Sequence, residues 1–329
     1  MTDDQQGAQK APRRARYTVR NANYAMQPQP PAEPIVEGLI YRGDLILPYG
    51  EAGSKKTYSF GCSLAVCVAA GKNWLAFGTR KTKVLIIDEE SGERRLSRRL
   101  ADSIRGELCD ETIELEYVSL ANFKLDDTTD AVLVQSLIEE TGAGLVIIDA
   151  LADIMDGDEN SKQDTQPVFS ALRKIADITN AAIIVIHHSN RAGGYRGSSA
   201  IKGAVDLMIE VRSDDGSRFI NFKTVKERDI ERLSWSAEAV WTEDQFYLKG
   251  VETREKTTFS KSENYVIRHL KEHKSATIDA LMDHADSCTA EAAKRAVYAL
   301  ADRSIVSRID GGGRGNKATY ALTEKGGEL

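Results

Sequence analysis

Residues 50–57, GEAGSKKT, nearly match the phosphate-binding loop pattern G-x-x-x-x-G-K-[S/T]. In such a loop, backbone N–H groups and a helix N-terminus point at phosphates, a lysine neutralises charge and a hydroxyl holds Mg²⁺. Gly50 supplies the first glycine, Lys56 the lysine and Thr57 the hydroxyl. We therefore expect ATP and Mg²⁺ to bind along this segment, at Gly50, Glu51, Ala52, Gly53, Ser54, Lys55, Lys56, Thr57 and Tyr58.

One position departs from the pattern, because Lys55 stands where the second glycine is usual. Glycine there allows close backbone approach and unrestricted φ. We expect the lysine to keep a helical φ and to send its side chain outward, although it adds charge beside the phosphates. The alternative register would make Lys55 the phosphate lysine and put Lys56 where a hydroxyl is needed, and we reject it. The departure therefore bears on turnover rather than on nucleotide binding.

Carboxylates follow two further apolar segments. LVIID ends in Asp149, which can hold Mg²⁺ through water as P-loop enzymes require, or can instead cap the next helix. IIDEES places Asp88, Glu89 and Glu90 at the end of another strand, where open α/β sheets bind ligands. Hydrolysis needs a base that orients the attacking water, and these carboxylates are the candidates.

Strands and helices must alternate to position these residues. Strands are predicted at DLILPY, KVLIID, LEYVSL, GLVIID and AAIIVIHH, and helices at KTYSFGCSLAVCVAAG, SGERRLSRRLADSI and AVLVQSLIEET. Continuous apolar runs between turn residues are typical of strands buried on both faces of a parallel sheet. The alternation predicts an α/β fold with right-handed crossovers. LMIEVR, FINFKTVK and QFYLKG follow without helices between them, so we expect added strands at one edge.

The ordered set of motifs resembles the RecA-type P-loop ATPases, most closely the RepA-like hexameric replicative helicases of plasmids and phages. The shared segments are GEAGSKKT, IIDEESGERRLSRRL, LVIIDALADIMDGDEN, IIVIHHSN and RGSSAIKGAVD, in the same order, within residues 38–228. The resemblance implies a RecA-like core, ATP hydrolysis, movement on single-stranded DNA, and a homo-oligomeric ring that we expect to be a hexamer.

The resemblance also implies roles for single residues. Glu90 corresponds to the catalytic base, with Glu89 as the second candidate. His188, with His187 beside it, ends the strand next to that of Asp149 and would sense the γ-phosphate. The alternative is that these histidines only satisfy hydrogen bonds at the strand end.

A basic residue from a neighbouring subunit completes the site in ring ATPases by neutralising charge on the transferred phosphoryl group. Arg196 matches that position in the RepA-like pattern and follows a loop, SNRAGGY, expected to face the central channel. Lys226 and Arg228 resemble the pair that wider relatives extend across the interface. All three remain candidates, the alternative being weak surface ion pairs.

Composition is that of an ordinary water-soluble protein, with 41% hydrophobic and 29% charged residues and a net charge of -6. No apolar run approaches the roughly 18–20 residues of a membrane helix, and the first residues lack the apolar core of a secretory signal. The four cysteines lack metal-ligand spacing and are expected to be buried thiols. We expect a cytoplasmic protein without a membrane partner.

Residues 1–34 are rich in Gln, Pro, Ala and Arg and have no periodic apolar face, so we expect a disordered tail. Its basic run PRRAR, residues 12–16, either contacts nucleic-acid phosphates or is simply solvated. The ATPase domain is expected to occupy residues 35–250, with a linker at residues 251–260.

Residues 261–329 are expected to form a winged helix, because three helical segments precede two strands around a glycine-rich tip. Its charges are sorted. Acidic Asp279, Asp283 and Asp286 crowd the second helix, whereas basic residues lie on the third helix and the hairpin: Lys294, Arg295, Arg303, Arg308, Arg314 and Lys317. Such a domain binds DNA or docks a protein.

The whole sequence predicts a DNA-acting ring ATPase, either a RepA-like replicative helicase or a helicase loader of a mobile element. The alternative is a DNA-binding initiator or regulator in which nucleotide acts as a switch with little turnover. The unusual Lys55 motivates that alternative.

Overall fold

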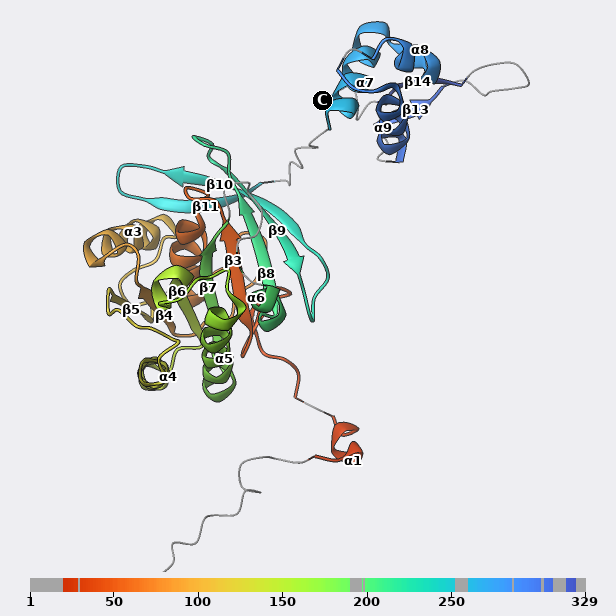
Figure 1. Cartoon of the computed structure of the whole chain (residues 1–329). Helices are drawn as coiled ribbons and strands as arrows, with labels where there is room; N and C mark the ends of the chain where they lie inside the picture. Colours follow the sequence, from red (N-terminus) through yellow and green to blue (C-terminus); the bar gives the residue numbers. More distant parts are fainter. Residues whose placement is uncertain are drawn as a thin grey trace, which may run out of the picture. The chain divides into compact units, whose positions relative to one another are not determined.

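The structure, a computed structural model, describes residues 20–28, 30–189, 197, 199–251, 260–285, 287–302, 305–309 and 318–323 (Figure 1). The chain divides into two compact units, Met1–Arg254 and Glu255–Leu329. The basic run at residues 12–16, the loop that carries Arg196, and the predicted hairpin tip lie outside the described residues.

A nine-stranded sheet forms the centre of the first unit, in the order β11-β10-β9-β8-β3-β7-β6-β4-β5 (Figure 1). Neighbouring strands from β8 to β5 run parallel, whereas β9, β10 and β11 are added antiparallel at one edge. The predicted mostly parallel sheet is confirmed, and FINFKTVK and QFYLKG are added edge strands as expected. LMIEVR, also expected to be an added edge strand, is instead β8, which runs parallel to β3 inside the sheet. The strands are β3 (Leu45–Gly50), β4 (Val84–Asp88), β5 (Leu115–Ser119), β6 (Leu145–Asp149), β7 (Ala182–His188), β8 (Leu207–Arg212), β9 (Phe219–Lys226), β10 (Ser234–Trp241) and β11 (Phe246–Val251).

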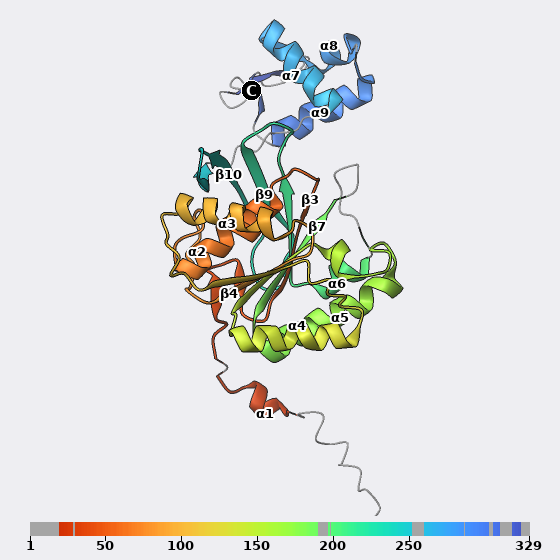
Figure 2. The same ribbon diagram turned by 90° about the vertical axis from the view of Figure 1, so that its left-hand side faces the viewer.

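Helices cover both faces of this sheet, so the unit has three layers (Figures 1 and 2). One face carries the π-helix η2 (Thr57–Leu64), α2 (Ala65–Ala70) and α3 (Glu93–Gly106). The other carries α4 (Thr128–Thr141), η3 (Leu151–Ile154), α5 (Lys162–Thr179) and α6 (Ser199–Ala204). The remaining short elements are α1 (Ala22–Ala25), β1 (Pro34–Val36) and β2 (Ile40–Tyr41).

The core explains why these strands are apolar throughout. Along β6, Leu145 and Ile147 pack into one hydrophobic cluster, while Val146 and Ile148 pack into the cluster on the opposite face. Successive strand residues point to opposite faces, so a strand with helices on both sides is apolar along its length up to the carboxyl end. The pattern read from the sequence is therefore the pattern of burial.

Helix ends follow local chemistry. Gly71 adopts a left-handed conformation, with φ 70°, and ends α2 as predicted. Asp127 and Ser161 accept backbone hydrogen bonds at the starts of α4 and α5. At the end of α3, Gly106 lies so close to β11 that a Cβ atom would be 2.0 Å from the Phe246 carbonyl oxygen. Glycine is required there for the helix to pack on the strand.

Two of the longer elements of the first unit, α5 and β10, were not predicted, nor were the short elements α1, β1, β2, η3 and α6. Helix α1 lies within residues 1–34, which were expected to be disordered. α5 has apolar residues at helical spacing, at Val168, Phe169, Leu172, Ile175 and Ala176, but it follows a polar loop and carries an internal proline, Pro167. β10 alternates small and polar residues, which makes a weak strand signal. α5 belongs to a covering layer and β10 to the antiparallel extension of the sheet, so both omissions leave the order of the parallel strands unchanged.

The second unit has its own hydrophobic core and the order α7 (Lys261–His273), β12 (Ser275–Thr277), α8 (Ile278–Asp283), α9 (Ala290–Asp302), β13 (Val306–Arg308) and β14 (Thr319–Leu322). Its three strands form an antiparallel sheet in the order β12-β14-β13. Three helices and a following strand pair were predicted, and β12 is an additional short strand.

Within the described ranges, no helix combines the length and the apolar character needed to cross a lipid bilayer. None of the four cysteines, all of which lie in the described ranges, forms a disulfide; Cys62 and Cys67 are buried as predicted, whereas Cys109 and Cys288 are only partly buried.

Candidate active site

The loop at residues 51–56 connects the end of β3 to the start of η2, at the carboxyl edge of the parallel strands. Gly50 packs against β8, where a Cβ atom would be 2.2 Å from the Val211 carbonyl oxygen. Gly53 has a φ of 81°, in the left-handed region. The loop therefore has the strand–turn–helix context that phosphate binding requires.

Lys56 is held inside this loop. Its ammonium donates hydrogen bonds to the carbonyl oxygens of Gly50 and Glu51, both at 2.8 Å. The side chain is buried, and burial lowers the pKa of Lys56 to about 8. A desolvated cation framed by its own loop is poised to bind an anion.

Asp149 and Thr57 meet beside this lysine. The Thr57 hydroxyl donates a hydrogen bond of 2.6 Å to Asp149 Oδ2. The two residues meet although β7 lies between β3, the strand before the loop, and β6, which ends in Asp149. Asp149 is buried, and burial raises its pKa to about 6 against the lowering effect of the Thr57 hydrogen bond. No side-chain hydrogen bond caps η3 at its N-terminus, so helix capping is not the role of Asp149.

The second Asp149 oxygen fits a divalent cation. Oδ1 is buried and has no hydrogen-bond partner among the described residues. Buried carboxylate oxygens without a partner are costly. A carboxylate and a hydroxyl are the hard oxygen donors that Mg²⁺ prefers. Thr57 and Asp149 are therefore suited to hold Mg²⁺.

The carboxylates that follow β4 are divided by their hydrogen bonds. Asp88 accepts from the backbone N–H groups of Ser91 and Gly92, at 3.0 and 2.9 Å. Glu89 is buried and accepts from the N–H groups of Asn122 and Phe123, at 2.9 and 3.3 Å. Both carboxylates hold turns in place.

Glu90 is different from these two, because its side chain is 46% exposed. Its Oε2 lies 3.8 Å from Nε2 of His188, and this histidine is the main cause of the lowered pKa of Glu90. His188 lies at the end of β7, next to Gly50 in the register of the sheet. Glu90 is therefore the ionised carboxylate that remains accessible, which favours it over Glu89.

His187 points into the protein instead. Its side chain is fully buried, with Nδ1 3.6 Å from Oε2 of Glu159. Only His188 of the two histidines lies beside Glu90.

The expected conformation of Lys55 is wrong. Its φ is 69°, in the left-handed region, where glycine is favoured. The chain has to turn there because Lys56, the next residue, already has helical φ and ψ. The Lys55 ammonium donates a 2.7 Å hydrogen bond to Oγ of Ser213, and burial lowers its pKa. The lysine thus ties the loop to the end of β8 and does not extend freely outward.

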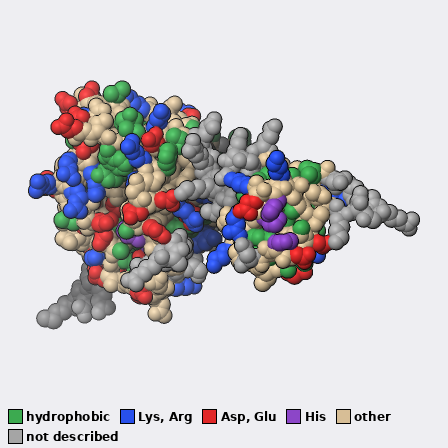
Figure 3. Space-filling view, turned by 90° about the horizontal axis from the view of Figure 1, so that it is seen from above, with side chains coloured by type: hydrophobic (Ala, Val, Ile, Leu, Met, Phe, Trp, Pro, Cys, Tyr) green, Lys and Arg blue, Asp and Glu red, His purple; other side chains and the backbone are tan. Residues whose placement is uncertain are grey.

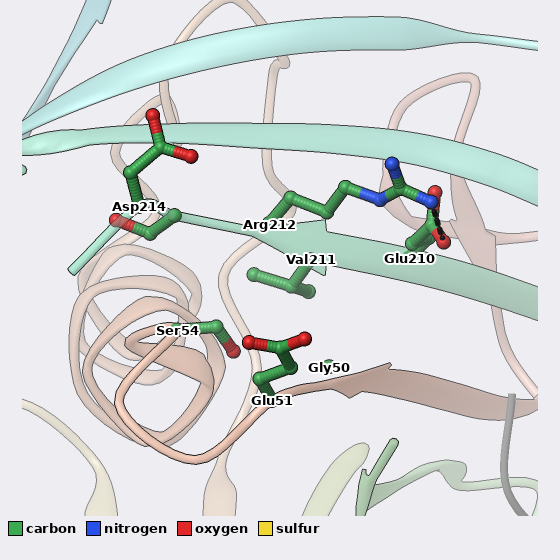
Figure 4. A pocket seen from close by; sticks show the side chains of 8 residues that line it. Gly50, Glu51, Ser54, Glu210, Val211, Arg212 and Asp214 are labelled. Carbon is green, nitrogen blue, oxygen red and sulfur yellow. Dashed lines mark hydrogen bonds and ion pairs between the residues drawn. The ribbon is translucent and has the colours of Figure 1, made fainter. Parts of the chain in front are cut away.

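A cavity of about 230 Å³ lies between the loop and the end of β8 (Figure 4). Glu51 and Ser54 lie on its loop side, and Arg212 pairs with Glu210 on the strand side at 2.8 Å. The sequence did not single out Arg212 or Ser213. The sequence signal for them was only the polar segment at the end of the predicted strand LMIEVR and directly after it, RSDD.

Tyr58 was predicted to bind nucleotide, but its ring packs against Phe246 at 4.7 Å and Trp241 at 5.7 Å. The Arg99 guanidinium lies 5.0 Å from the same ring. The Tyr58 ring therefore belongs to the layer between η2 and the outer strands.

Lys226 and Arg228 lie at the opposite edge of the sheet. Lys226 pairs with Met208 at the beginning of β8, and its ammonium donates to the carbonyls of Lys202 and Val205. Arg228 donates to the Gly203 carbonyl at 2.8 Å and pairs with Asp206 at 2.9 Å. The structure does not bring these two residues to the loop of their own chain.

Comparison with known proteins finds a family model and solved structures that are similar to this chain. A family model described as an AAA domain matches residues 11–194. A solved structure described as a DnaB-like replicative helicase with its interactions with primase has 14% identity and a TM-score of 0.52, covering 68% of this chain and 66% of that chain. A second solved structure, described as an ATPase domain, has 14% identity and a TM-score of 0.49, covering 63% of this chain and 85% of that chain. None of the curated proteins matches.

The left-handed conformation of Lys55 can be tested with two substitutions that both remove the ammonium. Lys55→Gly relieves the backbone strain and Lys55→Ala keeps it, so the glycine variant should be more stable by about 1 kcal/mol. Urea unfolding of both variants measures the difference. Equal stabilities would contradict the left-handed conformation.

The lowered pKa of Lys56 predicts a pH dependence of nucleotide affinity. Since the free protein loses this charge above about pH 8, ATP affinity should fall as the pH rises through that value. Binding should then take up a proton, which calorimetry in buffers of different ionisation enthalpy detects. The pKa of Lys56 in the folded chain lies below the ordinary value of 10.5. The free energy of unfolding should therefore rise as the pH increases from about 8 to 10.5. A flat affinity profile would contradict this placement of the lysine.

Proposed function

Because the chain belongs to the AAA domain family, we propose that it is an ATPase that couples ATP hydrolysis to movement on single-stranded DNA. The RecA-type P-loop family expected from the motifs is confirmed, and so is the RecA-like core. Hydrolysis, DNA and the ring are parts of the proposal.

The pairing of Thr57 with Asp149 beside the buried Lys56 carries this proposal. Lys56 would bind the phosphates of ATP, and Thr57 and Asp149 would hold Mg²⁺. Mg²⁺ held there would neutralise negative charge on the phosphates. Residues 50–55 would provide backbone N–H groups to the same phosphates.

Glu90 would act as the general base. It is exposed, ionised and next to His188, so it can accept a proton from a water that attacks the γ-phosphate. His188 lies between Glu90 and the start of the loop in the sheet register, which suits a sensor of the γ-phosphate. A change in its contact with Glu90 would report whether that phosphate is present.

A neighbouring subunit would complete the site. In the sheet register Lys226 lies opposite Met208, which is level with Leu47 on β3, three residues or about 10 Å before Gly50 at 3.3 Å per residue. The side chains of Lys226 and Arg228 donate to backbone carbonyls of residues 202–205, which precede β8, on the side away from the loop. Neither residue can therefore serve its own loop, whereas a head-to-tail ring would bring that side to the next subunit. Lys226, Arg228 and Arg196 are the candidates for the residue that acts in trans, and a hexamer is the proposed ring.

The second unit would be a winged helix that contacts DNA. Its order of elements and its antiparallel sheet β12-β14-β13 support this interpretation. Helix α9, with Lys294 and Arg295, would enter the major groove. Salt-dependent binding of duplex DNA that is lost when both residues are replaced by Gln would support this role, and unchanged duplex binding would favour protein docking.

A RepA-like replicative helicase, or a helicase loader, is the specific role that we propose. The relative with the TM-score of 0.52 is described as a DnaB-like replicative helicase. The nucleotide-switched initiator stays as a second candidate, because the Lys55–Ser213 hydrogen bond holds the loop to β8 and would slow its rearrangement during turnover.

ATP hydrolysis measured with and without single-stranded DNA tests the proposal. We expect turnover that DNA stimulates, and loss of ATP binding in Lys56→Ala with retention in Lys55→Ala as the matched control. Turnover that DNA leaves unchanged, with ATP still bound, would favour the switch. Unchanged ATP affinity in Lys56→Ala would contradict both the ATPase proposal and the nucleotide-switched initiator.

Glu90 and Glu89 can be separated by paired variants. Glu90→Gln should bind ATP normally and lower the hydrolysis rate by roughly 10²–10⁴-fold, with stability within about 0.5 kcal/mol of the original chain. Glu89→Gln should destabilise the protein by about 1–3 kcal/mol, because it disturbs two buried backbone donors. Full hydrolysis by Glu90→Gln would exclude it as the base.

A further inference from the structure

Helix α3 carries five arginines, and two of them have structural partners. Arg99 lies over the Tyr58 ring and donates to Oγ of Ser91 at 2.9 Å. Arg105 pairs with Asp102 and Asp244 at the other end of the helix. These two arginines hold α3 to its surroundings.

Arg94, Arg95 and Arg98 are different, because all three are exposed. None of them forms a hydrogen bond or an ion pair with another residue in the part of the chain that the structure describes. Together with Ser91, Gly92 and Glu93 they line an open hollow of about 560 Å³. Figure 3 shows Lys and Arg side chains gathered over α3 at the left edge of the larger unit.

These three arginines do not serve the stability of the helix. Arg94 and Arg95 lie in its first turn, where the helix dipole disfavours positive charge. Arg98 lies three and four residues further, within the distance at which like charges on a helix repel. A chain with a net charge of -6 has thus concentrated unpaired cations on one helical turn.

An aromatic side chain lies beside this basic turn. Tyr117 is on β5, the edge strand of the sheet, and its hydroxyl is 2.7 Å from Oγ of Ser97 on α3. Its side chain is on the α3 side of the sheet and the residue is 38% exposed. Leu120, 51% exposed, lies against Gly92 at the start of the same helix.

From these observations we infer that Arg94, Arg95, Arg98 and Tyr117 form a binding surface for single-stranded nucleic acid, here called the α3 surface. Planar guanidinium groups bind phosphates bidentately, and an exposed aromatic ring stacks on a base. The combination of free arginines with a neighbouring tyrosine favours nucleic acid over an acidic protein partner, which needs no stacking ring. The inference rests on the proposed action on DNA and adds a surface distinct from the loop that binds ATP.

The position of the α3 surface gives it access to the catalytic edge. Ser91 directly follows Glu90 in the chain. The backbone N–H groups of Ser91 and Gly92 donate hydrogen bonds to the Asp88 carboxylate, which holds this turn in place. A nucleic-acid strand bound to the α3 surface would therefore contact the turn that carries Glu90, the proposed base. Occupancy of the surface would steady that turn.

The test uses the full chain and a labelled oligothymidylate, with affinity measured by fluorescence anisotropy over a range of salt concentrations. The variant Arg94→Gln/Arg95→Gln/Arg98→Gln should bind at least about 10-fold more weakly at low salt. Three lost phosphate contacts should reduce the slope of log K against log salt by about 2, at 0.7 per contact. Tyr117→Leu should lower affinity without changing that slope.

A matched control replaces three exposed lysines elsewhere, Lys81, Lys223 and Lys249, by Gln. The control has the same net charge as the arginine variant and should keep the original slope. Equal affinity and slope in the arginine variant would overturn the α3 surface and leave the proposed function standing. A changed assembly state with unchanged DNA affinity would also overturn it, and would identify the surface as a contact between copies. Absence of DNA binding by the original chain would overturn the surface together with the proposed action on DNA.

Discussion

The hydrogen bond between Thr57 and Asp149 joins the start of the helix after the loop to a strand that is not adjacent to β3. It can form because all parallel strands end at one edge of the sheet and η2 begins above that edge. The same geometry brings Glu90 from β4 and His188 from β7 to this place. Removal of the parallel order would separate every residue of the site, so the fold itself is the main determinant of the chemistry.

Hydrogen bonds divide the carboxylates at this edge into those that support the structure and those that are available to a ligand. Asp88 and Glu89 use their oxygens to accept from backbone N–H groups. Asp149 keeps one oxygen without a partner among the described residues, and Glu90 keeps its exposure. The number of hydrogen bonds that each group already makes therefore distinguishes neighbouring carboxylates that look equivalent in the sequence.

The parallel core was predictable because burial on both faces leaves a strong signal, as in LVIID and AAIIVIHH. β10 was not, since its small residues pack against neighbours that only the folded sheet supplies. The loop, Asp149 and Glu90 were predictable from motif and position. The φ of Lys55 and its hydrogen bond with Ser213 were not, because they depend on a residue 158 positions away and on the turn into η2. Local pattern predicts which residues reach the edge, and tertiary contacts decide what each one touches there.

Helix α3 connects the turn that follows Glu90 to strand β11. It begins just after Glu90 and ends with Gly106 against the backbone of β11, a span of about 20 Å at 1.5 Å per residue. The close approach at Gly106 leaves no slack, since even one methyl group would collide with the strand. A displacement of the turn at Glu90 would therefore either move the outer antiparallel strands or bend α3. The sheet extension is in this way mechanically coupled to the place where hydrolysis would occur.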